Sequence, residues 1–405
     1  MNLLQIELPA NREPWLISLG ERVKMVAKAY AQGRKVNLLL YDHADTSTFR
    51  YRCYNLMQWT QQSEKWQCVY FYRDELDTVC QLLGKIQLLT FVRLQWFCEL
   101  ENLVYQARAR CIPIVYDTDD CIFDLNLLPL LANSIDIQFS IPGQYEYWFA
   151  YVARNGFTAK RAQMYSASND YLGKKLEKKF AKPYYVVRNT LNQEQLDVSR
   201  LCRIQKRLLN QMQSDKESDE RAFTIGYFSG SPSHNNDLAM VAPELALFLD
   251  RFRHAKFMVV GFMDFPQVLQ PAMARGQIIT YPLTDFLTLQ TLVASVEVNI
   301  VPLLENTFTN CKSELKFFEA GAVGTLTVAS PIYTYKNSIR HGVNGYLCEP
   351  GRWYDILTDI YLNWKKQRQI IEQAYMDSIE RYSGEQVIQE MEDAFEICLR
   401  REQQE

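Results

Sequence analysis

Two lysines and a glutamate in the second half of the chain could act together on an anionic ligand. They are Lys312, Lys316 and Glu319, within residues 310–330 (NCKSELKFFEAGAVGTLTVAS). The segment is typical of a helix with Ser313 as its N-cap, and spacings of four and seven residues place the three charged side chains on one face. Such a face can hold a diphosphate and a hydroxyl group together. A solvated stripe of charges is the alternative, and the small residues that follow favour a closely packed helix over it.

A loop rich in Gly, Ser and Asn follows another apolar stretch, in residues 224–238 (TIGYFSGSPSHNNDL). Gly230 permits a close approach of the backbone to a ligand, and Ser231 and His234 add polar groups. Asp237 is a candidate N-cap for the amphipathic helix that comes next, whose first N–H groups favour an anion. We interpret the loop as a diphosphate-binding segment, with an ordinary polar loop as the alternative. Because it matches neither a Walker motif nor GxGxxG, nucleotide hydrolysis and dinucleotide binding have little support.

Carboxylates gather in the first half directly after a predicted strand. Asp117, Asp119 and Asp120 follow the apolar stretch 111–116 (CIPIVY). In a cleft, Asp119 or Asp120 could orient a hydroxyl group or take its proton. The alternative is that these side chains cap the turn that follows.

Basic and aromatic residues alternate in two further segments of the first half. Arg50 and Arg52 follow the first predicted strand, where an arginine could bind a phosphate of a nucleotide or of a lipid diphosphate. The alternative is the exposed face of a helix start. Residues 144–161 (QYEYWFAYVARNGFTAKR) place an aromatic group beside basic residues, as on an anionic membrane surface. Packing within the first domain is the alternative reading of that segment.

The elements that must position these residues alternate between strand-like and helix-like patterns in both halves, which indicates an α/β fold. We predict strands at 35–41, 67–72, 86–91, 111–116, 165–167 and 184–187 in the first half, and at 224–228, 256–260, 278–281, 298–301 and 325–329 in the second. Each half is then a doubly wound sheet, and a cleft between the carboxyl ends of their strands is the expected binding site.

A change of composition marks the boundary between the two halves. The polar run that ends in QSDKESDER indicates a charged linker at 201–221. We therefore predict a first domain at 1–200 and a second at 222–365. The helices of 366–405 are expected to pack back toward the first domain.

Composition and residue patterns argue against several classes of protein. The chain has 405 residues with 44 Lys plus Arg against 47 Asp plus Glu, so a general nucleic-acid binder, which would carry a basic excess, is disfavoured. No apolar run reaches the roughly 18 to 20 residues that span a bilayer, and the first residues do not resemble a signal peptide. The ten cysteines form no CxxC pair, and the four histidines show no metal-ligand spacing. We expect a cytoplasmic protein with reduced thiols and no metal.

Residues 312–330, with HGVNGYL at 341–347, resemble the C-terminal half of family 4 glycosyltransferases of the GT-B fold. The similarity covers residues 224–350, and VVRNTLN at 186–192 is similar to the family's interdomain segment. IVYDTDDCIFD at 114–124 is similar to a motif of bacterial polysaccharide glycosyltransferases of the O-antigen type. The resemblance implies two Rossmann-like domains that face a central cleft.

The resemblance also implies an activity and a division of labour between the domains. A sugar would pass from a nucleotide sugar to a bacterial surface glycan or a polyprenyl-diphosphate-linked acceptor, with retention of configuration and without metal or other cofactor. The second domain would bind the donor, with Glu319 on the ribose and with Gly230, Ser231, His234, Lys312, Ser313 and Lys316 around the diphosphate. The first domain would hold the acceptor near Asp119, Asp120, Arg50 and Arg52. A peripheral position at the inner face of the membrane would suit such an acceptor.

The sequence departs from the family pattern at one acidic position. The family's pair of glutamates is separated by seven residues, and counting back from Glu319 gives Cys311. Because a thiol cannot accept hydrogen bonds from a hexose as a carboxylate does, recognition of the sugar must differ. A non-catalytic partner subunit of a glycan-assembly complex is therefore the main alternative, and a nucleotide-sugar epimerase is another. Asp117-x-Asp119 also matches the short metal-binding motif of the GT-A fold, but two α/β halves favour GT-B.

Overall fold

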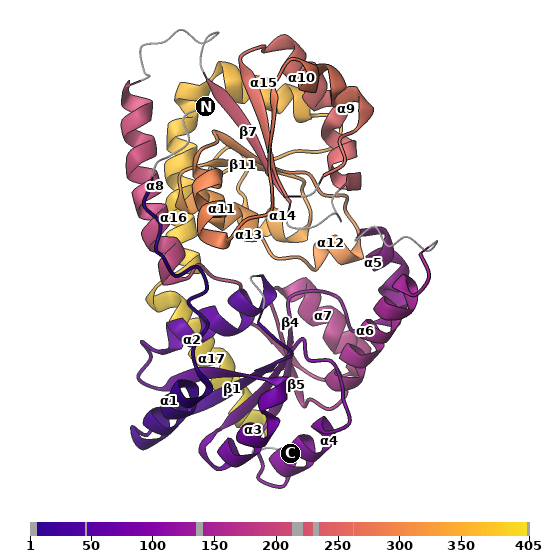
Figure 1. Ribbon diagram of the computed structural model, residues 1–405, viewed down its shortest axis with the longest axis vertical. Helices are drawn as coiled ribbons and strands as arrows, with labels where there is room; N and C mark the ends of the chain where they lie inside the picture. Colours follow the sequence, from indigo (N-terminus) through magenta and orange to yellow (C-terminus); the bar gives the residue numbers. More distant parts are fainter. Residues whose placement is uncertain are drawn as a thin grey trace.

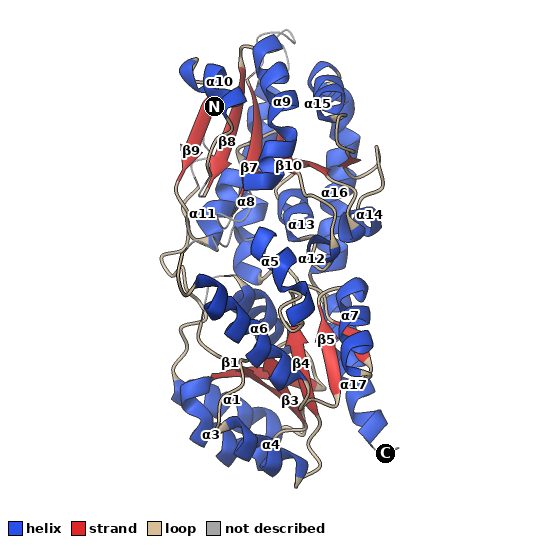
Figure 2. Ribbon diagram, turned by 90° about the vertical axis from the view of Figure 1, so that its right-hand side faces the viewer, coloured by secondary structure: helices blue, strands red, loops and turns tan. Residues whose placement is uncertain are grey.

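The computed structural model describes residues 6–44, 47–134, 141–212, 222–229, 235–261 and 263–402. These residues form two α/β domains, one above the other along the long axis of the molecule (Figure 1). Each domain contains a sheet whose described strands all run parallel, with helices on both of its faces (Figure 2).

The first domain has the strand order β2-β1-β3-β4-β5-β6. Its strands are β1 (Lys35–Tyr41), β2 (Trp66–Tyr72), β3 (Leu88–Val92), β4 (Ile114–Thr118), β5 (Met164–Ala167) and β6 (Tyr184–Val186). Its helices are α1 (Leu19–Ala31), α2 (Asn55–Thr60), α3 (Leu76–Leu82), α4 (Leu100–Arg108), α5 (Leu128–Ser134), α6 (Gln144–Ala159) and α7 (Asp170–Phe180), and a turn of π-helix (Arg50–Tyr54) precedes α2. β1 lies between β2 and β3, and in its register Lys35 pairs with Trp66 and Asn37 with Leu88.

The second domain has the strand order β12-β11-β10-β7-β8-β9. Its strands are β7 (Phe223–Phe228), β8 (Ala255–Val260), β9 (Ile278–Tyr281), β10 (Val298–Val301), β11 (Leu326–Ala329) and β12 (Tyr346–Leu347). Its helices are α9 (Asn235–Arg251), α10 (Gln270–Ala274), α11 (Phe286–Ala294), α12 (Thr307–Asn310), α13 (Leu315–Ala322), α14 (Tyr333–Ser338) and α15 (Trp353–Leu362).

Apolar runs form the strands because helices cover both faces of a parallel sheet. In β1, for example, every residue from Val36 to Tyr41 is buried. The predicted strands are all present, and none of their ends shifts by more than three residues. One shift matters for the site, because β4 continues to Thr118, so Asp117 lies in the strand and not in the loop after it.

Three helices connect the domains. α8 (Gln193–Met212) packs against α11 and α13 of the second domain, so the predicted boundary after residue 200 falls inside this helix. α16 (Gln367–Tyr382) also packs against α13, whereas α17 (Glu385–Glu402) crosses to the first domain. There Glu392 accepts a hydrogen bond from Ser63 and Glu396 accepts one from Trp66, at 2.6 and 2.8 Å.

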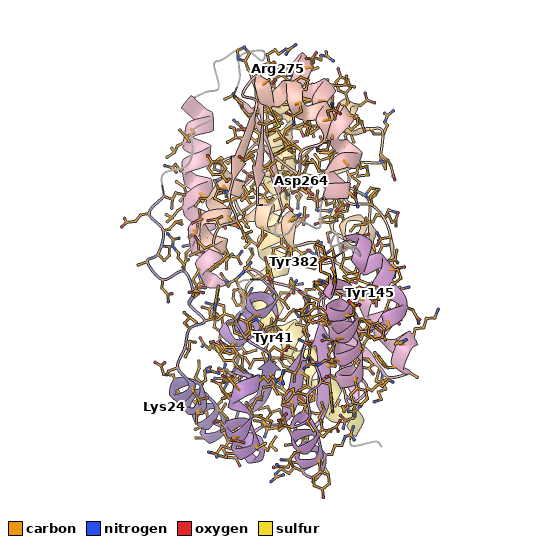
Figure 3. The ribbon with its side chains drawn as sticks, turned by 45° about the vertical axis from the view of Figure 1, so that its right-hand side comes forward. Lys24, Tyr41, Tyr145, Asp264, Arg275 and Tyr382 are labelled. Atoms are coloured by element: carbon orange, nitrogen blue, oxygen red, sulfur yellow. The ribbon has the colours of Figure 1, made fainter. Side chains whose placement is uncertain are left out.

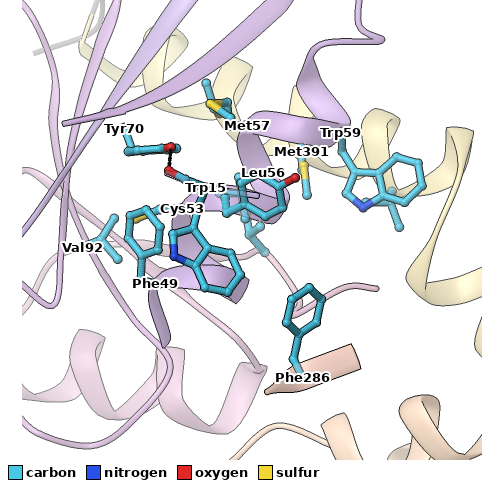
Figure 4. Packing of buried hydrophobic residues seen from close by; sticks show 14 of the residues in the cluster. Trp15, Phe49, Cys53, Leu56, Met57, Trp59, Tyr70, Val92, Phe286 and Met391 are labelled. Carbon is cyan, nitrogen blue, oxygen red and sulfur yellow. Dashed lines mark hydrogen bonds between the residues drawn. The ribbon is translucent and has the colours of Figure 1, made fainter. Parts of the chain in front are cut away.

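An aromatic cluster joins the two domains on the side of α11. Trp15 lies with its ring centroid 6.5 Å from that of Phe49 and 5.6 Å from that of Phe286, which begins α11 (Figure 4). The Tyr70 hydroxyl donates a hydrogen bond to the carbonyl of Trp15, which fixes the N-terminal segment in this position. Buried aromatic contact of this kind stabilises one arrangement of the domains.

The aromatic segment of α6 is divided between the core and the surface. Val152, Asn155 and Gly156 are buried, and Gly156 packs on the carbonyl of Phe123 so closely that a Cβ there would clash. Tyr147 and Phe149 are 62% and 46% exposed. They lie in the first turns of the helix, which also carry Tyr145, labelled in Figure 3. In the part of the chain that the structure describes, no helix has the length and apolar character needed to cross a bilayer.

Candidate functional site

A cavity of about 550 Å³ lies between the domains, with residues of both in its wall. The size is ordinary for a small-molecule site, and the position beyond the carboxyl ends of the strands is where open α/β sheets bind ligands. One part of the wall is apolar, with Phe228, Leu283, Phe286, Leu289 and Val293. The polar part is formed by Ser47, Thr48, Arg50, Tyr51, Asp119 and Asp120 of the first domain, and by Asn299, Lys312, Ser313, Lys316 and Glu319 of the second.

Glu319 lies in α13 and faces this cavity although it is only 7% exposed. Its Oε1 atom accepts hydrogen bonds from the Tyr51 hydroxyl and from Gln195 Nε2, the latter at 3.0 Å. Arg50 NH2 lies 3.7 Å from the same oxygen. The carboxylate predicted to bind a ribose is therefore held by groups of the first domain and of α8.

Lys316 lies one turn before Glu319 in the same helix and also lines the cavity. Burial lowers the pKa of its ammonium group to about 8, and the positive charge of Lys312 acts in the same direction, while Asp237 opposes the shift. Its Nζ lies 5.4 Å from the centre of the Tyr227 ring. An incompletely neutralised cation in a partly desolvated wall attracts an anionic ligand strongly.

Lys312 and Ser313 lie outside α13, in the turn that joins it to α12. The N-cap of α13 is Glu314, which makes no capping hydrogen bond with its side chain, so the prediction of Ser313 as cap is wrong. The physical reason is a longer-range contact: the Ser313 hydroxyl accepts a hydrogen bond of 2.9 Å from Asn189. Lys312 consequently does not share a helix face with Lys316, yet both line the same cavity.

Asp119 and Asp120 line the cavity from the first domain and are linked to Arg93. Arg93 NH1 lies 3.1 Å from Asp119 Oδ1 and 3.7 Å from Asp120 Oδ2, and it also donates to Thr48 at 2.7 Å. Burial raises the pKa of Asp119, with Arg93 opposing this effect and Asp120 adding to it. Lys312 Nζ approaches Asp120 Oδ1 to 3.8 Å from the second domain. The structure thus brings the predicted acidic residues and a predicted donor-binding lysine together.

The two predicted arginines have different environments. Arg50 lines the cavity beside Tyr51. Arg52 is 0% exposed and forms an ion pair with both carboxylate oxygens of Asp117. It also donates to Asn189 at 3.1 Å. The prediction that Arg52 binds a phosphate is therefore wrong, because its guanidinium is already neutralised inside the first domain.

The ion pair with Arg52 also engages Asp117, which is the first aspartate of the Asp117-x-Asp119 motif. Within the described ranges, no three His, Cys, Asp or Glu side chains come together as metal ligands would. Asp117 is 2% exposed and is absent from the cavity wall.

Cys311, at the position of the family's first glutamate, is buried away from the cavity. Its thiol contacts that of Cys121 in the first domain, and its carbonyl accepts a hydrogen bond of 2.7 Å from Asn169. It packs in the core cluster of the first domain together with Phe308. This position therefore anchors the turn before α13 to the other domain.

The structure describes only part of the second predicted diphosphate segment. Gly230, Ser231 and His234 lie outside the described residues. Asp237 is not the N-cap of its helix, since α9 begins at Asn235, and its Oδ1 instead accepts a hydrogen bond of 3.0 Å from the Leu304 amide.

Residues that sequence reasoning did not single out complete the polar wall. Arg93 directly follows β3, a position where open α/β sheets carry functional groups, and its φ of 43° is in the left-handed region. The position of Arg93 directly after a predicted strand could therefore have identified it from the sequence. Tyr51 and Gln195 reach the site only through contacts between segments that are far apart in the chain.

The second domain matches a known family. Residues 222–361 match the family described as Glycosyl transferases group 1. Among curated proteins, none matches this sequence.

Solved structures share the two-domain architecture. HepE of Anabaena in complex with UDP and glucose has a TM-score of 0.57 at 13% identity, over 90% of this chain and 100% of that chain. A glycosyltransferase from Rickettsia africae has a TM-score of 0.59 at 12% identity, over 90% and 99%. Sucrose-phosphate synthase from Thermosynechococcus elongatus has 0.55 at 12% identity, over 90% and 98%. The predicted GT-B fold is confirmed, and the domain match together with this fold supports a glycosyltransferase.

Proposed function

We propose that this protein is a retaining, metal-independent glycosyltransferase that moves a sugar from a nucleotide sugar to a glycan or lipid-linked oligosaccharide acceptor. The observation that carries the proposal is the composition of the cavity wall. Lys312, Lys316 and Glu319 stand on the second domain, and Asp119 and Asp120 stand opposite them on the first. HepE, which has the same fold, binds UDP and glucose, and this supports a nucleotide sugar as the donor.

In this proposal the second domain stabilises the leaving nucleotide. Negative charge grows on the diphosphate as the bond to the sugar breaks, and Lys312 and Lys316 are placed to stabilise that charge without reorganisation. Glu319 accepts hydrogen bonds from ribose hydroxyls. The apolar part of the wall then accommodates the base.

The first domain acts on the acceptor. Asp119 and Asp120 orient the acceptor hydroxyl, and one of them takes its proton as the new bond forms. Arg93 keeps both carboxylates in place through its contacts with Asp119 and Asp120. No metal or other cofactor has a role in these steps.

A lipid-linked acceptor would place the protein at a membrane surface. The exposed Tyr147 and Phe149 on α6 support this part of the proposal. Sedimentation with anionic phospholipid vesicles tests it, and a Tyr147→Ser/Phe149→Ser variant should lose vesicle binding. Equal sedimentation of both proteins would contradict it.

Thermal unfolding with UDP, GDP, ADP and their sugar conjugates tests the donor assignment. A ligand at 100 times its dissociation constant adds about 2.7 kcal/mol to the free energy of unfolding, so one series should raise the melting temperature clearly. Release of the nucleoside diphosphate in the presence of an acceptor extract should follow. If no nucleotide binds, the proposed function is wrong. If nucleotide binds but is never released from its sugar, the chain is a non-catalytic partner subunit.

A further inference from the structure

Two hydrogen-bond donors and one cation converge on one oxygen of Glu319. The Tyr51 hydroxyl, Gln195 Nε2 at 3.0 Å and Arg50 NH2 at 3.7 Å all approach Oε1. Among the described residues, none makes a hydrogen bond to Oε2. Since Glu319 lines the cavity, the carboxylate has one oxygen fixed and one available for a ligand.

These groups do not belong to the domain that carries the glutamate. Tyr51 and Arg50 lie in the π-helical turn after β1 of the first domain, and Gln195 lies near the start of α8. π-Helical turns in proteins frequently occur at functional sites. Here the turn directs the consecutive Arg50 and Tyr51 toward the second domain, while Arg52 binds Asp117 inside the first.

The ring of Tyr51 is held so that its hydroxyl has little freedom. Tyr51 is 4% exposed and its ring lies edge-on to Phe318, with centroids 6.4 Å apart. The Arg50 guanidinium stacks 4.1 Å from the centre of the same ring. The hydrogen bond to Glu319 therefore joins the two domains in the arrangement seen here.

We propose that Tyr51 is a positioning residue for the donor: by binding Glu319 Oε1 it aims Oε2 at the ribose, so that the acceptor domain contributes to nucleotide affinity. The inference rests on the proposed function, because it assumes that Glu319 binds the ribose. It goes further in assigning part of the donor affinity to a residue of the opposite domain. A consequence is that nucleotide binding and closure of the domains favour each other.

Tyr51→Phe tests this, since it removes the hydroxyl and keeps the ring. The dissociation constant should rise about three- to tenfold, within the range of coupling between contacting residues. It would be measured by calorimetry with whichever of UDP, GDP and ADP binds the wild-type protein. The donor KM should rise with it, while kcat at saturating donor stays within about twofold, as expected when binding is weakened equally in ground and transition states.

Tyr54→Phe is the matched control. Tyr54 belongs to the same π-helical turn and donates to Glu194 at 2.7 Å, but it does not line the cavity. Its removal should leave nucleotide affinity unchanged. A double-mutant cycle with Glu319→Gln then separates direct from indirect effects: once Glu319 is replaced, Tyr51→Phe should have no further effect on the dissociation constant.

The outcomes distinguish this inference from the proposed function. If Glu319→Gln leaves affinity unchanged, or if none of the three nucleotides binds, the donor assignment fails and the inference fails with it. If Glu319→Gln weakens binding but Tyr51→Phe does not, the inference alone is wrong. If Tyr51→Phe strengthens binding, the tyrosine occupies the place of the ribose and the inference is also wrong.

Discussion

Lys312 Nζ of the second domain lies 3.8 Å from Asp120 Oδ1 of the first, on the wall of the interdomain cavity. Both side chains are about a quarter exposed, and a pair of this kind contributes about 0–1 kcal/mol to stability. The pair is therefore more important for bringing two groups of the proposed reaction close together than for stability. In the proposed function, the cation that stabilises the leaving group and the carboxylate that acts on the incoming hydroxyl thus face each other across the cavity.

Lys316→Ala should lower kcat by at least roughly tenfold while the protein stays folded. A charge-assisted contact to the developing diphosphate charge contributes about 1.5–3 kcal/mol, and this contact is strongest in the transition state. Steady-state kinetics measure the effect, with Lys336→Ala as control because Lys336 is 50% exposed and pairs with Glu305. Wild-type kcat in Lys316→Ala would place the diphosphate elsewhere.

The pH dependence of kcat/KM should identify the same lysine. Because the pKa of Lys316 is lowered to about 8, its positive charge is lost as pH rises through that value. kcat/KM reports groups of the free enzyme, so it should fall on the alkaline side of pH 8. Lys316→Arg keeps the charge and should remove this fall. A wild-type profile that stays flat to pH 10 would contradict the assignment.

Arg93→Met should move the acid limb of kcat/KM to higher pH. Burial raises the pKa of Asp119, and the charges of Asp120 and Asp117 add to this effect. The guanidinium groups of Arg93 and Arg52 oppose it and lower the pKa. Without Arg93 the carboxylate is protonated at a higher pH, so activity that needs its ionised form is lost earlier as pH falls. Arg154→Met is the control, since that guanidinium donates to the Trp96 carbonyl instead. An unmoved acid limb would exclude Asp119 as the titrating group.

Arg52→Met should destabilise the protein by about 3–5 kcal/mol, because it leaves Asp117 buried without its partner. Urea unfolding measures the change. Arg207→Met removes the exposed pair with Glu372 and should cost about 0–1 kcal/mol. If Arg52→Met instead lowers donor affinity at unchanged stability, the buried ion pair is part of the binding site.

Removal of divalent metal should leave transfer intact. The proposed charge stabilisation comes from Lys312 and Lys316, and Asp117 is already engaged by Arg52. Initial rates in excess EDTA should equal those in buffer with added Mn²⁺. A loss of activity that Mn²⁺ restores would show that Asp119 acts with a metal.

The fold could be predicted because its signals are local. Short apolar runs such as Val36–Tyr41 mark strands that helices cover on both sides, and their alternation with amphipathic segments defines two doubly wound sheets. The end of β4 was missed because Asp117 is polar. Its burial depends on Arg52, which lies 65 residues earlier in the chain.

The site could be predicted only in part, because several of its contacts join segments that are far apart in the chain. Lys316 and Glu319 were found because both lie within one helix. The role of Ser313 depends on Asn189, 124 residues away, and the environment of Glu319 depends on Tyr51, 268 residues away. Contacts between such distant segments leave no periodic trace in the sequence.

The contacts of α17 with the first domain affect how that domain folds during synthesis. Lys35 in β1 binds Glu396 in α17, 361 positions later, and Trp66 and Ser63 bind the same helix. At roughly 5–20 residues per second on the ribosome, this partner emerges some 20–70 seconds after β1. Throughout that interval the first domain has an uncovered surface around Trp66. A nascent chain arrested before α17 should therefore bind a hydrophobic dye or a chaperone, and the released chain should not.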